Sequence, residues 1–479
     1  MTSARFVLLT IADPVEARAW LGSLKNDLTS AETKPAERAV NVAFTPAGLK
    51  RLGLPASCLE GFSREFIEGM DTPHRRRVLG DTTPDSPTKR DRSPDTWDWG
   101  NRADAENGHV LLIMYAKGWH ELTCLDTDQK SRYKAAGLVE HRTFDPLHLT
   151  GRTEHFGFRD GIAQPFVENV EKEAPLRVRE KNEYGNSVPP GEILLGYPNA
   201  YGTLPPSPVD ATGASKLSFD FGEHGSYLVV RQLSQDVKAF WDFLIEVAGP
   251  PGPDQPAGGA AVELASKMVG RWPSGVPLAL SSRKNDPLAI DEDEYAYDKL
   301  DPLGLITPIG SHTRRSNPRD SLEPGPAGEG RLSASDSLAV TKLHRIIRRG
   351  RPYGKPVADS MQPADIVRAL AADSYPKVDR GLLFLCFNAN IARQFEFIQQ
   401  TWIDNPKFGG LYEDSDPLMG NREPKGMTHP ADVFTQQATP VRRRINNLPD
   451  FVRVLGGGYF FMPGLEAVQH LAGLDTPCG

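Results

Sequence analysis

The segment Glu154–Pro165, which reads EHFGFRDGIAQP, is the most informative stretch of this 479-residue chain. It places one carboxylate, Asp160, in a turn that also contains Gly157 and Gly161. Glycine accepts backbone angles that other residues resist, and it lets a flat ligand come close to the main chain. Charged and aromatic side chains crowd the same turn, which indicates a functional loop rather than an ordinary surface connection.

A second motif lies in the C-terminal half, where one histidine is followed by three arginines. His312 precedes Arg314, Arg315 and Arg319 within seven residues. Imidazole nitrogen is a good ligand for iron, and guanidinium groups bind carboxylates through paired hydrogen bonds. The pattern is therefore typical of a site for an anionic iron porphyrin. Taken alone, it also fits a solvated basic turn.

Two further segments carry candidate residues. His344–Gly354 reads HRIIRRGRPYG and follows a stretch, Ser333–Lys342, that predicts a helix. A basic helix end that interacts with its own dipole is the alternative interpretation. The apolar run Leu382–Phe387 predicts a strand whose alternation puts Leu383, Leu385 and Phe387 on one face. Taken alone, this run fits ordinary core packing.

In this order along the chain, the segments resemble the dye-decolourising peroxidases, a family of haem enzymes. The glycine-x-x-aspartate-glycine signature of that family falls on Gly157–Gly161, and its proximal histidine motif falls on His312. The strand Gly457–Pro463 adds to the resemblance, which covers most of the chain. The polar stretches 71–107 and 320–335 are similar to the insertions of the larger branch of the family.

The resemblance implies roles for individual residues. A haem-ligating histidine usually donates its second ring proton to an acceptor; Asp416 is the candidate acceptor, with Asp301 as second choice. The other implied roles are Asp160 and Arg348 as catalytic residues, with Arg349 as the alternative arginine; His312 as the axial ligand of the haem iron; Arg319, Arg315, Phe158, Gly161, Leu385 and Phe387 as further haem contacts; and Tyr353, ahead of Trp402, as an electron relay to the surface.

The same resemblance implies a peroxidase with one haem b per chain. Its substrates would be hydrogen peroxide and a dye, phenol or other aromatic reductant, which is oxidised in one-electron steps through a ferryl intermediate. Aspartate has a pKa of about 3.9, so an aspartate base predicts an acidic optimum. The alternatives are a haem carrier or sensor with incidental peroxidase activity, and a protein without haem whose arginines bind a phosphorylated metabolite.

The composition and net charge of the chain indicate which partners and which cellular location to expect. The net charge of −7 argues against a nucleic-acid partner, and the chain has no apolar run long enough to span a membrane. The four cysteines, Cys58, Cys124, Cys386 and Cys478, form no C-x-x-C pair. Reduced thiols and the lack of a signal-peptide pattern at the N-terminus predict a cytoplasmic protein. The physiological reductant and the oligomeric state cannot be inferred from the sequence.

Strand and helix patterns are intermixed in both halves of the chain, which predicts the α+β class. We expect two ferredoxin-like domains, residues 1–205 and 206–479, each an antiparallel sheet with helices packed on it. The proline-rich stretch Val188–Pro208 is the expected linker, and a faint likeness between Phe44–Leu49 and Phe461–Leu465 suggests a duplication. The expected strands are 5–11, 40–44, 109–116, 226–232, 381–388 and 452–462; the expected helices are 14–28, one beginning at Pro46, 236–244, 391–402 and 463–474.

Overall fold

A computed structural model describes residues 1–30, 35–83, 91–104, 106–169, 185–211, 218–249, 258–326, 328, 331–424 and 429–474. Within these ranges no helix is both long and apolar enough to cross a membrane. Cys58, Cys124 and Cys386 are free thiols, and Cys478 lies outside the described residues.

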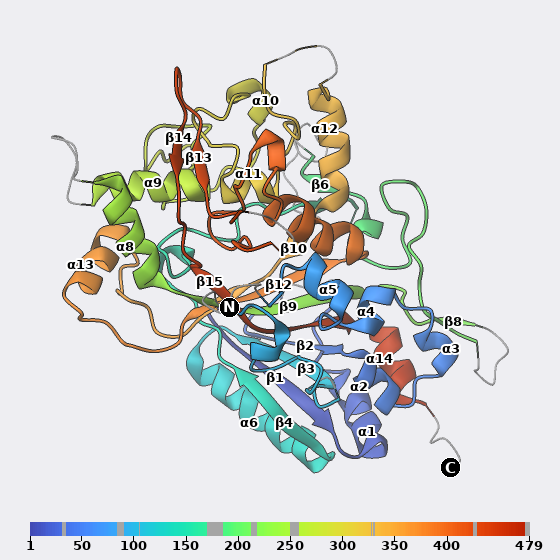
Figure 1. Cartoon of the computed structure of the whole chain (residues 1–479). Helices are drawn as coiled ribbons and strands as arrows, with labels where there is room; N and C mark the ends of the chain where they lie inside the picture. The colour runs from blue at the N-terminus through green and yellow to red at the C-terminus, as the bar shows by residue number, and fades with distance from the viewer. Residues whose placement is uncertain are drawn as a thin grey trace.

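A nine-stranded antiparallel sheet runs through the molecule (Figure 1). The strand order is β10-β12-β9-β15-β2-β3-β1-β4, with β11 paired to β12. One end consists of β1 (Ser3–Ile11), β2 (Arg38–Phe44), β3 (Val110–Ala116) and β4 (Leu138–Phe144). The other end consists of β9 (Ser226–Gln235), β10 (Ile347–Arg348), β11 (Arg351–Tyr353), β12 (Gly381–Asn388) and β15 (Val452–Met462).

Each end of the sheet therefore comes from one half of the chain, and this confirms the α+β prediction with antiparallel sheets. The two ends join where β15 pairs with β2, at Phe461 and Phe44. Three two-stranded sheets lie outside the main one: β5 (Phe166–Val167) with β6 (Ser187–Val188), β7 (Val209–Asp210) with β8 (Phe219–Asp220), and β13 (Phe434–Gln436) with β14 (Arg443–Ile445). The domain limits at residues 205 and 206 stay a prediction.

The N-terminal helices begin where the sequence has capping residues. Asp13 caps α1 (Pro14–Leu24), and Thr45 caps α2 (Pro46–Arg51) by accepting from the Gly48 amide at 3.1 Å. The other α-helices in the described part of this half are α3 (Ala56–Leu59), α4 (Arg64–Glu68), α5 (Pro73–Val78) and α6 (Trp119–Ala135). Helix α5 lies within the polar stretch 71–107, which was interpreted as an insertion, and no prediction covered α6.

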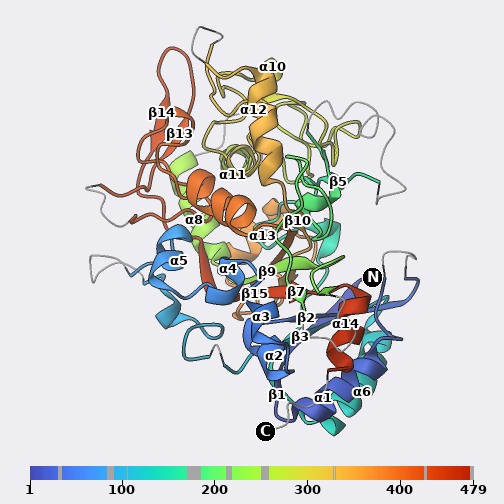
Figure 2. The same ribbon diagram turned by 90° about the vertical axis from the view of Figure 1, so that its right-hand side faces the viewer.

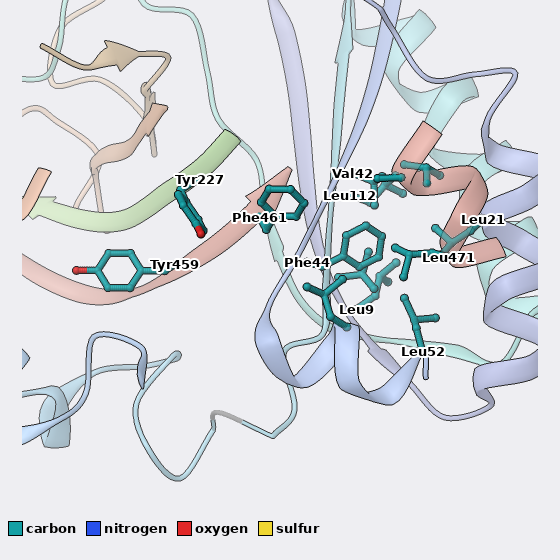
Figure 3. Close-up of a cluster of buried hydrophobic side chains, with 14 of the residues drawn as sticks. Leu9, Leu21, Val42, Phe44, Leu52, Leu112, Tyr227, Tyr459, Phe461 and Leu471 are labelled. Carbon is teal, nitrogen blue, oxygen red and sulfur yellow. The ribbon is translucent and has the colours of Figure 1, made fainter. Parts of the chain in front are cut away.

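The last helix of the chain returns to the first half. Helix α14 (Leu465–Ala472) packs against α1, and both gather with α6 at the same end of the molecule (Figures 1 and 2). Figure 3 shows Leu471 of α14 close to Leu21 of α1, in the core that also holds Phe44 and Leu112. The closing helix therefore covers the sheet of the N-terminal half.

The C-terminal half supplies the elements above the other end of the sheet (Figures 1 and 2). They are α8 (Val237–Ala248), α9 (Gly259–Val269), α10 (Tyr297–Leu300), α11 (His312–Ser316), α12 (Ala334–Thr341) and α13 (Pro363–Ala371). The expected helix at 391–402 is present as two π-helical segments, Ala392–Glu396 and Ile398–Ile403. The expected linker is not free chain, since Val188, Ile193 and Leu195 are buried.

Candidate active site

A large cavity lies between the turn that carries Asp160 and helix α11. Its volume is about 1700 Å³ when its open mouth is included. Apolar and aromatic side chains form much of its wall, and a few charged groups converge on it. The lining residues that matter for its chemistry are Phe158, Asp160, Gly161, His312, Arg319, Arg345, Arg348, Leu382, Phe384, Phe395 and Trp402.

His312 is the first residue of α11, and its ring is held by a buried carboxylate. Its Nδ1 donates to Asp416 Oδ2 at 2.8 Å, and the Asp416 side chain is 0% exposed. Burial disfavours charge on both groups, yet their mutual attraction prevails, so the pKa of His312 is raised and the pKa of Asp416 is lowered. Since a carboxylate can only accept, Nδ1 carries the proton, and in the neutral ring Nε2 is left unprotonated and able to act as a ligand.

Asp416 is itself held in place by the main chain. Its Oδ1 accepts from the amides of Leu418 at 3.0 Å and Met419 at 3.1 Å. Asp301, the second choice for this role, lies elsewhere: it accepts from the amides of Ile306 and Thr307. Of the two candidate acceptors, only Asp416 contacts the histidine.

Asp160 lines the same cavity. Arg348 Nη1 donates to Asp160 Oδ1 at 3.1 Å, and about one third of the Asp160 side chain is exposed. Burial raises the pKa of Asp160, but the charge of Arg348 and a hydrogen bond from the Gly161 amide outweigh it, so the pKa lies below its ordinary value. The carboxylate is therefore ionised at neutral and mildly acidic pH.

The turn around Asp160 needs its two glycines for different reasons. Gly157 has φ +95°, and a Cβ there would lie 2.9 Å from Ile366 Cδ1 and 3.0 Å from the Met361 carbonyl oxygen. Gly161 has φ +78°, but a Cβ there would meet nothing within 4 Å. Gly157 is thus required by packing as well as backbone angle, and Gly161 by backbone angle alone.

A second carboxylate, Glu154, fastens this turn to the sheet. It accepts from the amides of Phe156 and Phe158, each at 2.9 Å, and from Gln235 Nε2 on β9. Burial raises its pKa to about 7. Sequence reasoning did not single out Glu154, although its place six residues before Asp160 in the same glycine-containing turn was a usable signal.

The structure distinguishes between Arg348 and Arg349, the two candidates for the catalytic arginine. The Arg348 amide donates to Gln164 Oε1 at 2.9 Å, which orients the edge strand β10 so that its guanidinium lies beside Asp160. The Arg349 side chain is exposed and does not line the cavity. Arg348 is therefore the arginine that shares the cavity with Asp160 and His312.

The expected role of Arg315 in binding a cofactor is wrong. Its guanidinium is fully buried beneath the cavity wall and donates to the main-chain oxygens of Gly310, Trp402, Asn405 and Asp414. These four carbonyl groups use its donors, so Arg315 holds α11 against the neighbouring segments. Arg319 does line the cavity, with its guanidinium paired to Asp293 and stacked 4.0 Å from the centre of the Tyr295 ring.

Arg345 is a cavity residue that sequence reasoning missed. It is 8% exposed and donates to Asn186 Oδ1 at 2.9 Å. Burial lowers its pKa to about 10, because neighbouring charges offset the cost of desolvation only in part. The sequence offered one weak signal, since Arg345 belongs to the same arginine-rich segment as Arg348 and Arg349.

Strand β12 presents the opposite face from the one expected. Leu382 and Phe384 line the cavity, whereas Leu385 and Phe387 line a different hollow on the other side of the sheet. The predicted alternation is present, but the pattern alone does not say which face is covered by the site. Leu385 and Phe387 are therefore corrected as wall residues, and Phe158 and Gly161 lie on the wall as expected.

The chain is similar to curated peroxidases over nearly its full length. No family model matches it. It is 28% identical over 485 residues to the multifunctional dye peroxidase DyP2 of Amycolatopsis sp., covering 97% of this chain and 91% of the relative. It is 27% identical over 491 residues to dye-decolorizing peroxidase msp1 of Mycetinis scorodonius, covering 97% and 83%.

The chain belongs to the dye-decolourising peroxidase family. It is an oxidoreductase of the peroxidase class. A crystal structure of a decolorizing peroxidase from Auricularia auricula-judae has the same fold, with a TM-score of 0.72 at 24% identity over 98% of this chain and 96% of that one.

The cavity of this dye-decolourising peroxidase fits an iron porphyrin. It offers the imidazole of His312, apolar and aromatic walls, and cations for two carboxylates. The buried donors Asn317 Nδ2 and Arg319 Nε have no protein partner, and both residues line the cavity. A ligand that carries carboxylates would satisfy such donors.

The expected relay residues stand in different positions. Tyr353 does not line the cavity of the peroxidase, and burial raises the pKa of its phenol to about 12. Trp402 does line it and packs edge-on against Phe397 and His344. The relay through Tyr353 stays a prediction.

Proposed function

We propose that this protein is a haem b peroxidase, with one haem per chain bound between His312 and Asp160. It reduces hydrogen peroxide and oxidises dyes, phenols or other aromatic reductants. The observation that supports the proposal is that one cavity is lined both by an imidazole hydrogen-bonded to a buried carboxylate and by an aspartate–arginine pair.

In this proposal His312 Nε2 ligates the iron, while Asp416 keeps the ring in the tautomer that frees this nitrogen. Arg345 and Arg319 line the cavity and would supply the cations for the two propionates of a porphyrin. Bound haem supplies the site of peroxide reduction and stores two oxidising equivalents. The overall reaction balances as one hydrogen peroxide and two phenols giving two waters and two phenoxyl radicals.

Asp160 moves the proton. As an ionised carboxylate it accepts the proton from one peroxide oxygen and delivers it to the other, which then leaves as water. Positioned proton transfer of this kind contributes about 10²–10⁴-fold to a rate. Arg348 holds a positive charge beside the oxygen on which negative charge develops, an electrostatic contribution of similar size or larger.

Absorption spectra before and after peroxide test the proposal. The purified protein should show a Soret band that peroxide changes rapidly. Asp160→Ala should slow this change, while His312→Ala should mainly lose haem; Asp365→Ala, an exposed carboxylate on α13, is the control. If Asp160→Ala responds at the parental rate, Arg348 is the principal catalyst and the ranking proposed is wrong.

Other parts of the proposal rest on the sequence alone. A cytoplasmic location follows from the expected reduced cysteines and stays a prediction. The haem carrier is not favoured, since the relatives over nearly the full chain are named as peroxidases.

A further inference from the structure

A second hollow, which we call the arginine groove, lies on the face of the sheet opposite the haem cavity. Its volume is about 1720 Å³ when its open mouth is included. The residues that define it are Tyr115, His148, Arg152, Arg349, Arg351 and Phe387. These residues belong to β3, β11, β12 and the loops beside them, and none of them lines the haem cavity.

The groove and the cavity meet at one point. Asp160, Gly161 and Arg348 line both hollows. Arg348 belongs to β10, the edge strand of the sheet, and the Asp160 turn lies around that edge. A molecule in the groove would therefore be separated from the cavity by a single layer of side chains.

Four arginines are among the described lining residues of the groove, and two of them are paired with carboxylates: Arg348 with Asp160, and Arg152 with Asp291 at 3.7 Å. Asp160 is the only acidic residue among its described lining residues, and it is already paired with Arg348. Arg351 donates to two main-chain oxygens, those of Met1 and Thr2, rather than to a carboxylate. Burial, together with the charges of Arg351, Arg152 and the N-terminal amino group, lowers the pKa of His148.

The floor of the groove suits an aromatic ring. Ile113, Leu385 and Phe387 line it, and the Arg351 guanidinium lies 4.9 Å from the centre of the Tyr115 ring. A ring packed on such a floor, with an anionic group on the guanidinium, would satisfy both parts of the surface.

We propose that the arginine groove binds the reducing substrate, and that it selects aromatic molecules carrying a carboxylate or sulfonate. This inference rests on the proposed function and names the substrate class for it. Each bound phenol gives up one electron and one proton and leaves as a phenoxyl radical, so two phenols are consumed for each peroxide. Arg351 is the specificity residue, because it joins the aromatic floor to the anion.

Three phenols that differ in charge test the proposal: 4-hydroxyphenylacetate, tyrosol and tyramine. With the holoenzyme and saturating peroxide, KM should be lowest for the anion and highest for the cation, with the anion about fivefold below neutral tyrosol. Sodium chloride at high concentration should reduce the difference, because the groove is open to solvent. Equilibrium dialysis of 4-hydroxyphenylacetate against peroxide-free holoenzyme should show the same preference without turnover.

Arg351→Gln should raise KM for 4-hydroxyphenylacetate about fivefold and leave KM for tyrosol within twofold. Arg351→Lys keeps the charge and should retain the preference, which guards against a simple folding defect. Arg368→Gln on α13 makes the same change in net charge at a side chain that is 76% exposed and remote from the groove lining, and it should have no effect.

Equal KM values for the three phenols in the parent protein would overturn the proposal, as would equal effects of Arg351→Gln and Arg368→Gln. The rate of the spectral change with peroxide alone is measured beside these values. If that rate is normal while charge preference is absent, the groove inference fails and the proposed function stands; if peroxide causes no change, the proposed function fails.

Discussion

Replacing Asp416 with asparagine tests how the protein holds its proximal histidine. The substitution keeps the shape of the side chain and leaves an oxygen for the amides of Leu418 and Met419. The asparagine NH₂ group would then face the Nδ1–H group of His312, so that two donors would point at each other. To relieve this clash the ring must move its proton to Nε2, the nitrogen that should ligate iron. If the asparagine amide is flipped, its NH₂ group faces the main-chain N–H groups of Leu418 and Met419, which are also donors.

The structure allows the size of the effect to be worked out. The lost bond is a charge-assisted one of 2.8 Å to a carboxylate that is 0% exposed, so no water replaces it. Hydrogen bonds to charged groups contribute about 1.5–3 kcal/mol. At about 1.4 kcal/mol for each factor of ten, we expect haem to bind roughly 10- to 150-fold more weakly. Mutation of a group that orients a metal ligand typically lowers metal affinity or activity by about 10–100-fold, which agrees with this range.

The assay is a titration of the apoprotein with haemin, followed at the Soret band. Asp301→Asn is the matched control, because Asp301 is a buried carboxylate that binds main-chain amides and Arg314 but does not contact His312. The control should lower Tm without weakening haem binding. Haem affinity of Asp416→Asn within twofold of the parent, or an equal loss in Asp301→Asn, would refute the reasoning.

Three further predictions concern protons and electrons. Because the pKa of Asp160 lies below its ordinary value, the base stays ionised as pH falls, and the rate of the spectral change with peroxide should not decline between pH 7 and pH 4; a steady decline in stopped-flow measurements, with haem retained, contradicts this. The pKa of Glu154 rises from 4.5 to about 7, so the folded state holds its proton more tightly, and stability is lost as pH rises through this window. Urea unfolding should show that the free energy of unfolding of the parent falls by about 3 kcal/mol relative to that of Glu154→Gln between pH 4.5 and pH 7.5. The same pH dependence in both proteins would contradict this prediction. Tyr353→Phe should slow turnover of bulky dyes while leaving small phenols unaffected, and normal dye turnover by this variant would dispose of the relay.

Much of the local structure could be predicted because it depends on near neighbours. The cap at Thr45 with Pro46 behind it, and the buried run Val110–Ala116, each specify an element through residues a few positions apart. Helix α6 was not predicted because its sequence is mostly polar and shows no clear apolar stripe. In the structure it packs on the sheet.

The candidate site was predictable as a set of motifs but not as a set of contacts. Spacing singled out Asp160 and His312, which lie 152 residues apart in the sequence and line one cavity. The same spacing could not separate Arg348 from Arg349. That choice depends on the direction in which an edge strand of two residues presents its side chains.

The sequence by itself determined most of the elements, the two antiparallel halves and the residue types of the site, because these follow from local propensity and short motifs. Only the tertiary structure decided which face of β12 meets the cavity, that Arg315 holds the scaffold while Arg345 lines the site, and that Asp416 reaches His312 from 104 residues away. Such choices depend on which surfaces the packed chain covers. A change of one residue in register reverses the face of a strand, and no local pattern records that outcome.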